Sequence, residues 1–131
     1  LGADGVQIGS RFAASTESSA HINFKKEIII ASENDTILTL KELAPVRILK
    51  SPFYTKIFDA YNNGASTQEL KTLLGRGRAK KGMFEGNLEE GELEIGQVSA
   101  QIDEIKTVDE IMEELTKGFK RAKNNLNKFD F

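Results

Sequence analysis

LGADGVQIGSRF, residues 1–12, is the stretch that indicates the fold of this chain of 131 residues. Val6 and Ile8 alternate with polar neighbours, which is typical of a half-buried strand. Gly9 follows them, and its missing Cβ lets a ligand approach the backbone closely. Ser10 adds a backbone N–H and a hydroxyl at the carboxyl end of the strand, where α/β folds bind ligands. The stretch therefore predicts a strand that ends at a ligand site.

The composition is that of one globular domain, with 29% charged and 39% hydrophobic residues. The net charge of −2 gives no reason to expect a nucleic acid as a partner. No apolar run approaches the roughly 18 residues that a membrane span requires. Cysteine is absent, which excludes disulfides and thiolate chemistry and fits a reducing compartment. We therefore expect a cytoplasmic protein without a membrane or nucleic-acid partner.

The first part of the chain predicts short elements separated by turn signals. A strand covers residues 5–12, and a helix follows over about 18–32, although the isoleucine run at 28–30 also suits a strand. Residues 36–40 alternate like a short strand, and residues 46–49 can pair with them as a small hairpin.

The later part predicts helices with clear starting signals. Pro52 after Ser51 begins one helix, because proline is favoured at the first helical position. Residues 66–69, STQE, form a capping box that begins another. Helical segments are also expected over 79–85 and 92–105.

The last helix has the strongest signal. Residues 107–110, TVDE, form a second capping box. An apolar stripe at helical spacing follows, made of Val108, Ile111, Met112, Leu115 and Phe119. Residues 124–131 are expected to be a frayed tail.

Residues 2–12 resemble the last barrel strand of the nitronate monooxygenase family, the flavin-dependent proteins also called 2-nitropropane dioxygenases. The flavin-type enoyl-acyl-carrier-protein reductases are close relatives of this family. The family's strand ends in Met-Gly-Thr-Arg-Phe or a near variant, for which Ile8 and Ser10 are mild replacements.

Three later segments resemble the same family, in the same order. Residues 17–25, ESSAHINFK, are similar to Glu-x-x-Ala-His-Pro-x-Tyr-Lys, with Ile22 in place of the proline and Phe24 in place of the tyrosine. Residues 45–47, PVR, match a short following segment, and residues 90–101, EGELEIGQVSAQ, resemble a late Gly-x-x-x-x-Gly-Gln segment. The resemblance therefore spans nearly the whole chain.

The resemblance implies an α/β fold in which this chain is the C-terminal fragment of a (β/α)8 TIM barrel. A lone strand has no sheet to join, and a whole barrel needs about 250 residues. We therefore expect the remainder of the barrel, an N-terminal part, as a partner. The expected divisions are 1–33 for the last strand and its helix, 34–106 for a mostly helical subdomain with the hairpin, and 107–131 for the amphipathic helix and tail.

The resemblance also implies FMN as cofactor, with its phosphate held at Gly9 and Ser10. Gln97 belongs to the Gly-Gln pair and is expected to contact the flavin or the substrate, although Gly96 equally suits close helix packing. The implied reaction oxidises a nitronate, a small-molecule substrate, with O₂ to a carbonyl compound and nitrite. The family's catalytic histidine lies in an earlier loop, so this chain is expected to supply no catalytic residue and to be inactive alone. A homodimer is left open.

Several conspicuous residues have plainer explanations. His21, the only histidine, is expected to cap a helix or to make a structural hydrogen bond. Arg11 could offset the charge of a bound phosphate, but a structural ion pair is the preferred expectation. Residues 75–82, GRGRAKKG, lack the spacing of a phosphate-binding loop and suit a solvated junction between helices. The acidic residues at 89–94 lack metal-ligand spacing, so no metal is expected.

Two other functions stay open. The first is a flavin-type enoyl-acyl-carrier-protein reductase that uses NAD(P)H. The second is a helical interaction module without enzymatic activity, whose contact surface would be the basic residues 76–81.

Overall fold

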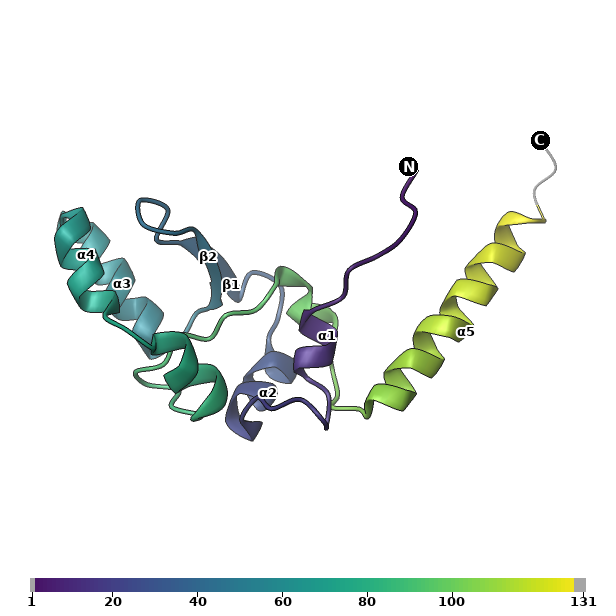
Figure 1. Ribbon diagram of the computed structural model, residues 1–131. Coiled ribbons are helices and arrows are strands. Elements are labelled where there is room, and N and C mark those ends of the chain that lie inside the picture. Colours follow the sequence, from purple (N-terminus) through teal and green to yellow (C-terminus); the bar gives the residue numbers. More distant parts are fainter. Residues whose placement is uncertain (1, 129–131) are drawn as a thin grey trace.

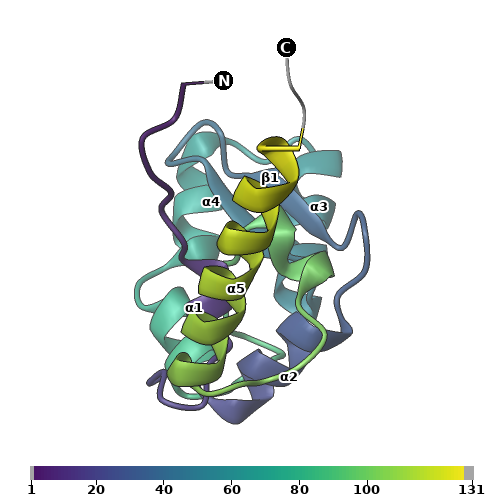
Figure 2. The same cartoon turned by 90° about the vertical axis from the view of Figure 1, so that its right-hand side faces the viewer.

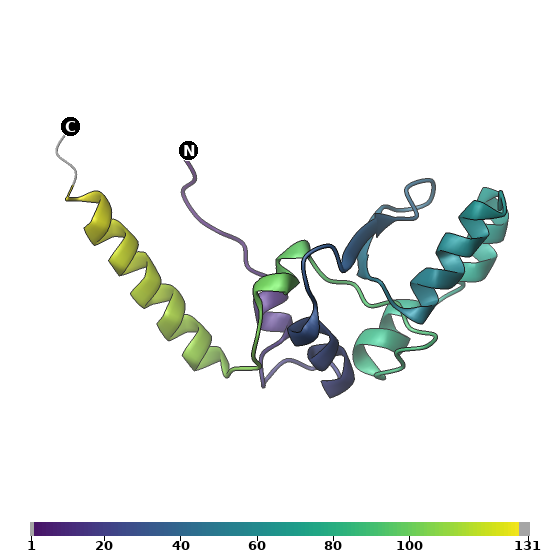
Figure 3. The same cartoon turned by 180° about the vertical axis from the view of Figure 1, so that it is seen from behind.

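The computed structural model describes residues 2–128, which form short helices around one hairpin. In chain order the elements are α1 (Ser10–Ala13), α2 (Ile22–Ile30), β1 (Thr36–Thr39), β2 (Val46–Leu49), α3 (Pro52–Asn62), α4 (Thr67–Leu74), the π-helical turn η1 (Lys80–Phe84), the 3-10 helix η2 (Gln97–Gln101) and α5 (Val108–Leu126). Figure 1 shows α3 and α4 at one end of the molecule and α5 at the other, with the hairpin, α1 and α2 between them. Figure 3 shows the same order from behind.

β1 and β2 form the predicted hairpin, an antiparallel pair that runs from Thr36 opposite Leu49 to Thr39 opposite Val46. The chain enters α3 through Ser51, whose hydroxyl caps the helix, so the start predicted from Ser51 and its proline is confirmed. One apolar cluster lies between the hairpin and α3, with its buried members at Leu40, Ile48, Phe53 and Ile57.

A second apolar cluster joins α2 to the segment that precedes η2. Its buried members are Ala14, Phe24, Ile28, Leu49, Leu93, Ile95 and Ile102. The segment runs beside β2, because the backbone N–H of Leu49 donates to the carbonyl of Leu93 at 2.9 Å and that of Ile95 donates to the carbonyl of Arg47 at 3.2 Å. The two clusters therefore lie against the same hairpin.

The helix predicted over 92–105 is wrong. Leu93 and Ile95 are buried on either side of the less buried Glu94, which is the alternation of an extended segment. The unpaired N–H and C=O groups along β2 bond this segment, and those bonds satisfy both backbones. Within the predicted range 92–105, the described helical part is the short 3-10 helix η2.

The strand predicted over 5–12 is also wrong in the described part of the chain. Residues 2–9 have no regular secondary structure, and α1 begins at Ser10. Val6 is 85% exposed. A strand requires a neighbour to bond its N–H and C=O groups, and residues 2–128 provide none for this segment. We expected an α/β fold. The described residues form helices and one two-stranded antiparallel sheet.

The α2 helix confirms the helical interpretation of the isoleucine run at 28–30, although it is shorter than the predicted 18–32. The segment predicted over 79–85 is helical but forms a π-helical turn at 80–84. The capping box at Ser66 and Glu69 is formed as predicted at the start of α4.

The last predicted helix is confirmed as α5, and its capping box at Thr107 and Glu110 is formed. The helix continues to Leu126, so the predicted tail is partly helical, while residues 129–131 lie outside the described part. Figure 2, viewed from the α5 end, shows this helix in front of the rest of the molecule. None of the described helices is both long and apolar enough to cross a membrane. The three expected divisions of the chain stay predictions.

Candidate functional site

The predicted site residues Gly9 and Ser10 lie at the start of α1, and Ser10 contacts a distant part of the chain. The backbone N–H of Gly96 donates to the Ser10 Oγ at 3.2 Å, across 86 residues of sequence. A Cβ on Gly96 would lie 2.9 Å from that oxygen, so glycine is what allows the approach. The tertiary fold therefore joins the first motif to the late Gly-Gln segment.

A hollow of about 610 Å³ opens beside this contact. We call it the Gly9–Ser10 hollow, and it is lined by Gln7, Ile8, Gly9, Ser10, Arg11, Val98, Gln101 and Ile102. A Cβ added to Gly9 would meet no atom within 4 Å, so the backbone there is open to a ligand.

Arg11 also borders this hollow, but its guanidinium is engaged elsewhere. Its Nη1 donates to the backbone carbonyl of Glu104 at 2.8 Å, in the loop that precedes α5. Arg11 therefore contacts the backbone, but the ion pair predicted for it is not formed among the described residues.

Gln97 lines a neighbouring hollow instead. This second hollow, of about 510 Å³, is called the Arg47 hollow and is lined by Glu33, Asn34, Thr36, Arg47, Gln97, Val98, Ala100 and Gln101. Val98 and Gln101 border both hollows, so η2 is the wall between them. The fold thus brings Gly9 and Ser10 together with Gly96, and places the side chain of Gln97 on the other side of that wall.

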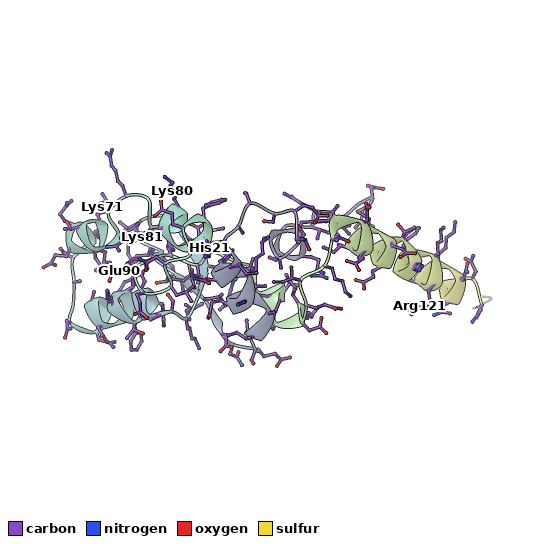
Figure 4. All side chains as sticks on the ribbon, turned by 90° about the horizontal axis from the view of Figure 1, so that it is seen from below. His21, Lys71, Lys80, Lys81, Glu90 and Arg121 are labelled. Atoms are coloured by element: carbon purple, nitrogen blue, oxygen red, sulfur yellow. The ribbon has the colours of Figure 1, made fainter. Side chains whose placement is uncertain are left out.

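The predicted capping role of His21 is confirmed. Its Nδ1 accepts a hydrogen bond from the backbone N–H of Asn23 at 3.1 Å at the start of α2. The Asn23 side chain donates to the carbonyl of Gly86 at 3.0 Å, and a Cβ on Gly86 would overlap the His21 ring. Figure 4 shows His21 between α2 and the η1 region, where it joins these two parts.

Two of the basic residues around η1 have acidic partners. Lys80 forms an ion pair with Glu85 at 3.5 Å, and Arg78 donates to Glu90 at 2.8 Å. The hydrogen bonds from Lys56 and Arg78 lower the pKa of the Glu90 carboxyl. Figure 4 shows this cluster at the end of the molecule opposite Arg121. The arrangement fits the predicted solvated junction.

The family model described as nitronate monooxygenase matches residues 1–118. The chain belongs to the nitronate monooxygenase family. The family resemblance drawn from the sequence motifs is confirmed. None of the curated proteins compared with the chain matches it significantly.

Two solved structures of FabK from Thermotoga maritima are similar to this member of the nitronate monooxygenase family. One is similar to the chain with a TM-score of 0.88 and 37% sequence identity, covering 98% of this chain and 41% of FabK. The other, a mutant of FabK, has a TM-score of 0.81 and 36% identity, covering 98% of this chain and 38% of FabK. The chain therefore spans about two-fifths of the length of FabK.

Two charged residues of this family member were not singled out by the sequence. Arg47 lies within the matching PVR segment, but nothing in that segment indicates the hollow that its side chain borders. Glu92 is buried, and its Oε1 has no hydrogen-bond partner in the described residues. Burial, followed by the nearby Glu94 charge, raises the pKa of the Glu92 carboxyl to about 7, against a smaller lowering by Arg78. Only the tertiary fold sets these environments.

Proposed function

We propose that this chain is the part of an FMN-dependent oxidoreductase that holds the phosphate of FMN. The observation that carries the proposal is the hydrogen bond from Gly96 to the Ser10 hydroxyl at the edge of the Gly9–Ser10 hollow. The hollow is within the size range of ordinary ligand sites, roughly 300–1,000 Å³. A glycine that leaves the backbone open and a hydroxyl that can donate both suit a phosphate.

The hydrogen-bond arrangement leaves Ser10 able to donate. Its oxygen accepts the Gly96 N–H, so its own hydroxyl proton is available to a phosphate oxygen in the hollow. Gly9 leaves the approach open because it has no side chain. FMN, when bound, would supply the redox chemistry, and the protein would bind and orient it. Gln97 lines the neighbouring Arg47 hollow, on the other side of η2. We keep it as a proposed contact for a part of the cofactor that extends past η2.

The first candidate reaction is the oxidation of a nitronate with O₂ to a carbonyl compound and nitrite. Its support is the match of the family model to residues 1–118. The second candidate is reduction of an enoyl-acyl-carrier-protein substrate with NAD(P)H. Its support is the likeness to FabK over 98% of the chain at 37% identity. Both reactions share the flavin, and both would take their catalytic residue from outside this chain.

We also propose that the remainder of a TIM barrel covers the apolar side of α5. Met112, Leu115 and Phe119 lie exposed on this helix and face Val6 and Phe12 across a hollow of about 560 Å³. The chain spans about two-fifths of FabK, so a protein of the length of FabK has a large part available to fill this space. A homodimer is the alternative occupant of this face.

The Ser10→Ala variant of the full-length protein tests the phosphate site. We expect its FMN affinity to fall by roughly 10- to 150-fold, because a hydrogen bond to a charged group contributes roughly 1.5–3 kcal/mol. Flavin fluorescence quenching during titration with FMN measures the affinity. Ser32→Ala is the matched control, since this serine is exposed and borders neither hollow. Equal FMN affinity in the Ser10 variant and wild type would contradict the assignment.

The two candidate reactions differ in the compound that reduces the flavin, and this difference can be measured on the FMN-loaded protein. Under anaerobic conditions, bleaching of the flavin by NADH or NADPH and reoxidation by an enoyl thioester would support the reductase. Bleaching by a nitronate, with nitrite released in air, would support the monooxygenase. A protein that takes up no FMN would contradict the oxidoreductase proposal and leave the interaction module.

A further inference from the structure

Arg47 is a positive charge held at the edge of a hollow. Its Nη1 donates to the Oγ1 of Thr36 at 3.1 Å and to the carbonyl of the same residue at 3.4 Å. These bonds fold the side chain along the hairpin, where it is half-buried. Within residues 2–128 the guanidinium forms no salt bridge and no other side-chain hydrogen bond. Its remaining N–H groups are therefore free to bind a ligand.

The opposite wall of the Arg47 hollow adds neutral donors. Gln97 and Gln101 border the hollow from η2, and each side-chain amide carries an N–H₂ group. Asn34, whose φ of 72° places it in the left-handed region, adds a third amide at the turn before β1. Glu33 is the one acidic residue of the lining; it is exposed and forms no ion pair with Arg47. The amide N–H₂ groups of the lining are therefore available to donate to an anion bound at Arg47.

We propose that the Arg47 hollow is an oxyanion subsite that binds a phosphate or carboxylate group of a ligand taken up beside the Gly9–Ser10 hollow. A guanidinium presents parallel N–H groups that match either oxyanion in a bidentate way. Anchoring by Thr36 reduces the conformational freedom that Arg47 would lose on binding. The position beside a flavin rests on the proposed function, whereas the binding of an anion at Arg47 does not.

The test uses the full-length protein saturated with FMN, so that free phosphate does not compete for the Gly9–Ser10 hollow. Inorganic phosphate and acetate are titrated separately by calorimetry at constant ionic strength. We expect Arg47→Gln to weaken anion binding about tenfold or more, and Arg47→Lys to lie between this variant and wild type. Arg76→Gln, which removes an exposed arginine outside the hollow, should bind as wild type does. Retained FMN content shows that each variant is folded.

The two anions distinguish the source of the ligand group. Clearly tighter binding of phosphate would assign the subsite to a phosphate-bearing ligand, and clearly tighter binding of acetate would assign it to a carboxylate. Comparable binding of both would support an oxyanion subsite that accepts either group. Unchanged affinity in Arg47→Gln, or no binding of either anion up to about 50 mM, would overturn the proposal. If the protein takes up no FMN but binds phosphate in an Arg47-dependent way, the proposed function fails and the subsite remains.

Discussion

Glu92 is a carboxylic acid placed where its charge is unfavourable. The side chain is 6% exposed and one of its oxygens has no partner in the described residues. Its pKa is raised to about 7, first by burial and then by Glu94. The folded state therefore binds the proton more tightly than the unfolded state does, which means that this group stabilises the fold at low pH. That contribution is present below the ordinary pKa of a glutamate and is lost as the pH rises through about 7.

We predict that Glu92→Gln removes this part of the pH dependence. At pH 8 the variant should be more stable than wild type by on the order of 2 kcal/mol, and at pH 5 the difference should largely disappear. Urea unfolding at pH 5, 6.5 and 8 measures the free energies. Glu89→Gln is the control, because Glu89 is exposed in the same loop. A variant that is less stable than wild type at pH 8 would refute the interpretation.

At the scale of the elements, two glycines determine how η1 meets the segment at residues 91–93. A Cβ on Gly91 would overlap the backbone of Gly82 and the carbonyl oxygen of Asn87. Gly82 itself faces the carbonyl of Glu92 and the side chain of Leu93. The π-helical turn and the extended segment therefore touch backbone to backbone, which no larger residue permits.

We predict that Gly91→Ala lowers the stability by about 3 kcal/mol, because the clash is with backbone that cannot rotate away. Gly118→Ala is the matched control within α5, where an added Cβ meets no atom within 4 Å. This second change should raise the stability by about 0.5–1 kcal/mol, since alanine is the better helix former. Thermal unfolding compares the two. Equal melting temperatures for both variants would show that the η1 contact is looser than described.

The element scale also shows where prediction from sequence succeeds. The capping boxes at Ser66 and Thr107 and the Ser51–Pro52 start were found because each acts within about one helical turn. The segment over 92–105 was mistaken because its apolar spacing fits a helix as well as it fits an extended segment. The partner that decides between them, β2, lies more than 40 residues away in sequence.

At the scale of the whole molecule, α5 stands at one end with its apolar side largely uncovered. Phe119 is 69% exposed and Met112 is 49% exposed. Exposed apolar surface of this kind marks an interface. Our proposal assigns the interface to the rest of a barrel, and a second copy of the chain is the competing occupant.

We predict that Phe119→Ser affects stability differently in two forms of the protein. In the full-length protein it should cost about 2 kcal/mol or more, because a large buried side chain is lost. In the chain of residues 1–131 it should cost almost nothing and reduce self-association. Unfolding and analytical ultracentrifugation of both forms measure this, with Phe84→Ser on η1 as control. An equally small cost in both forms, with no self-association, would refute an interface on α5.

The local features of this chain were readable from residues a few positions apart: the hairpin, the helix caps, the α5 stripe and the His21 cap. Each depends on hydrogen bonds or spacings within one or two turns of chain. The family motifs belong to the same class, since they are short runs of sequence. They indicated the family, which the comparison then showed.

The long-range features depended on the fold alone. The Gly96 contact of Ser10 spans 86 residues, and the hollow beside Arg47 forms only where the hairpin meets η2. The buried state of Glu92 requires elements that are distant in sequence, and residues 2–9 have no strand partner among the described residues. The hydrogen bonds of a backbone group and the pKa of a side chain depend on the atoms that surround them in space. Packing brings those atoms together, and many of them are distant in sequence.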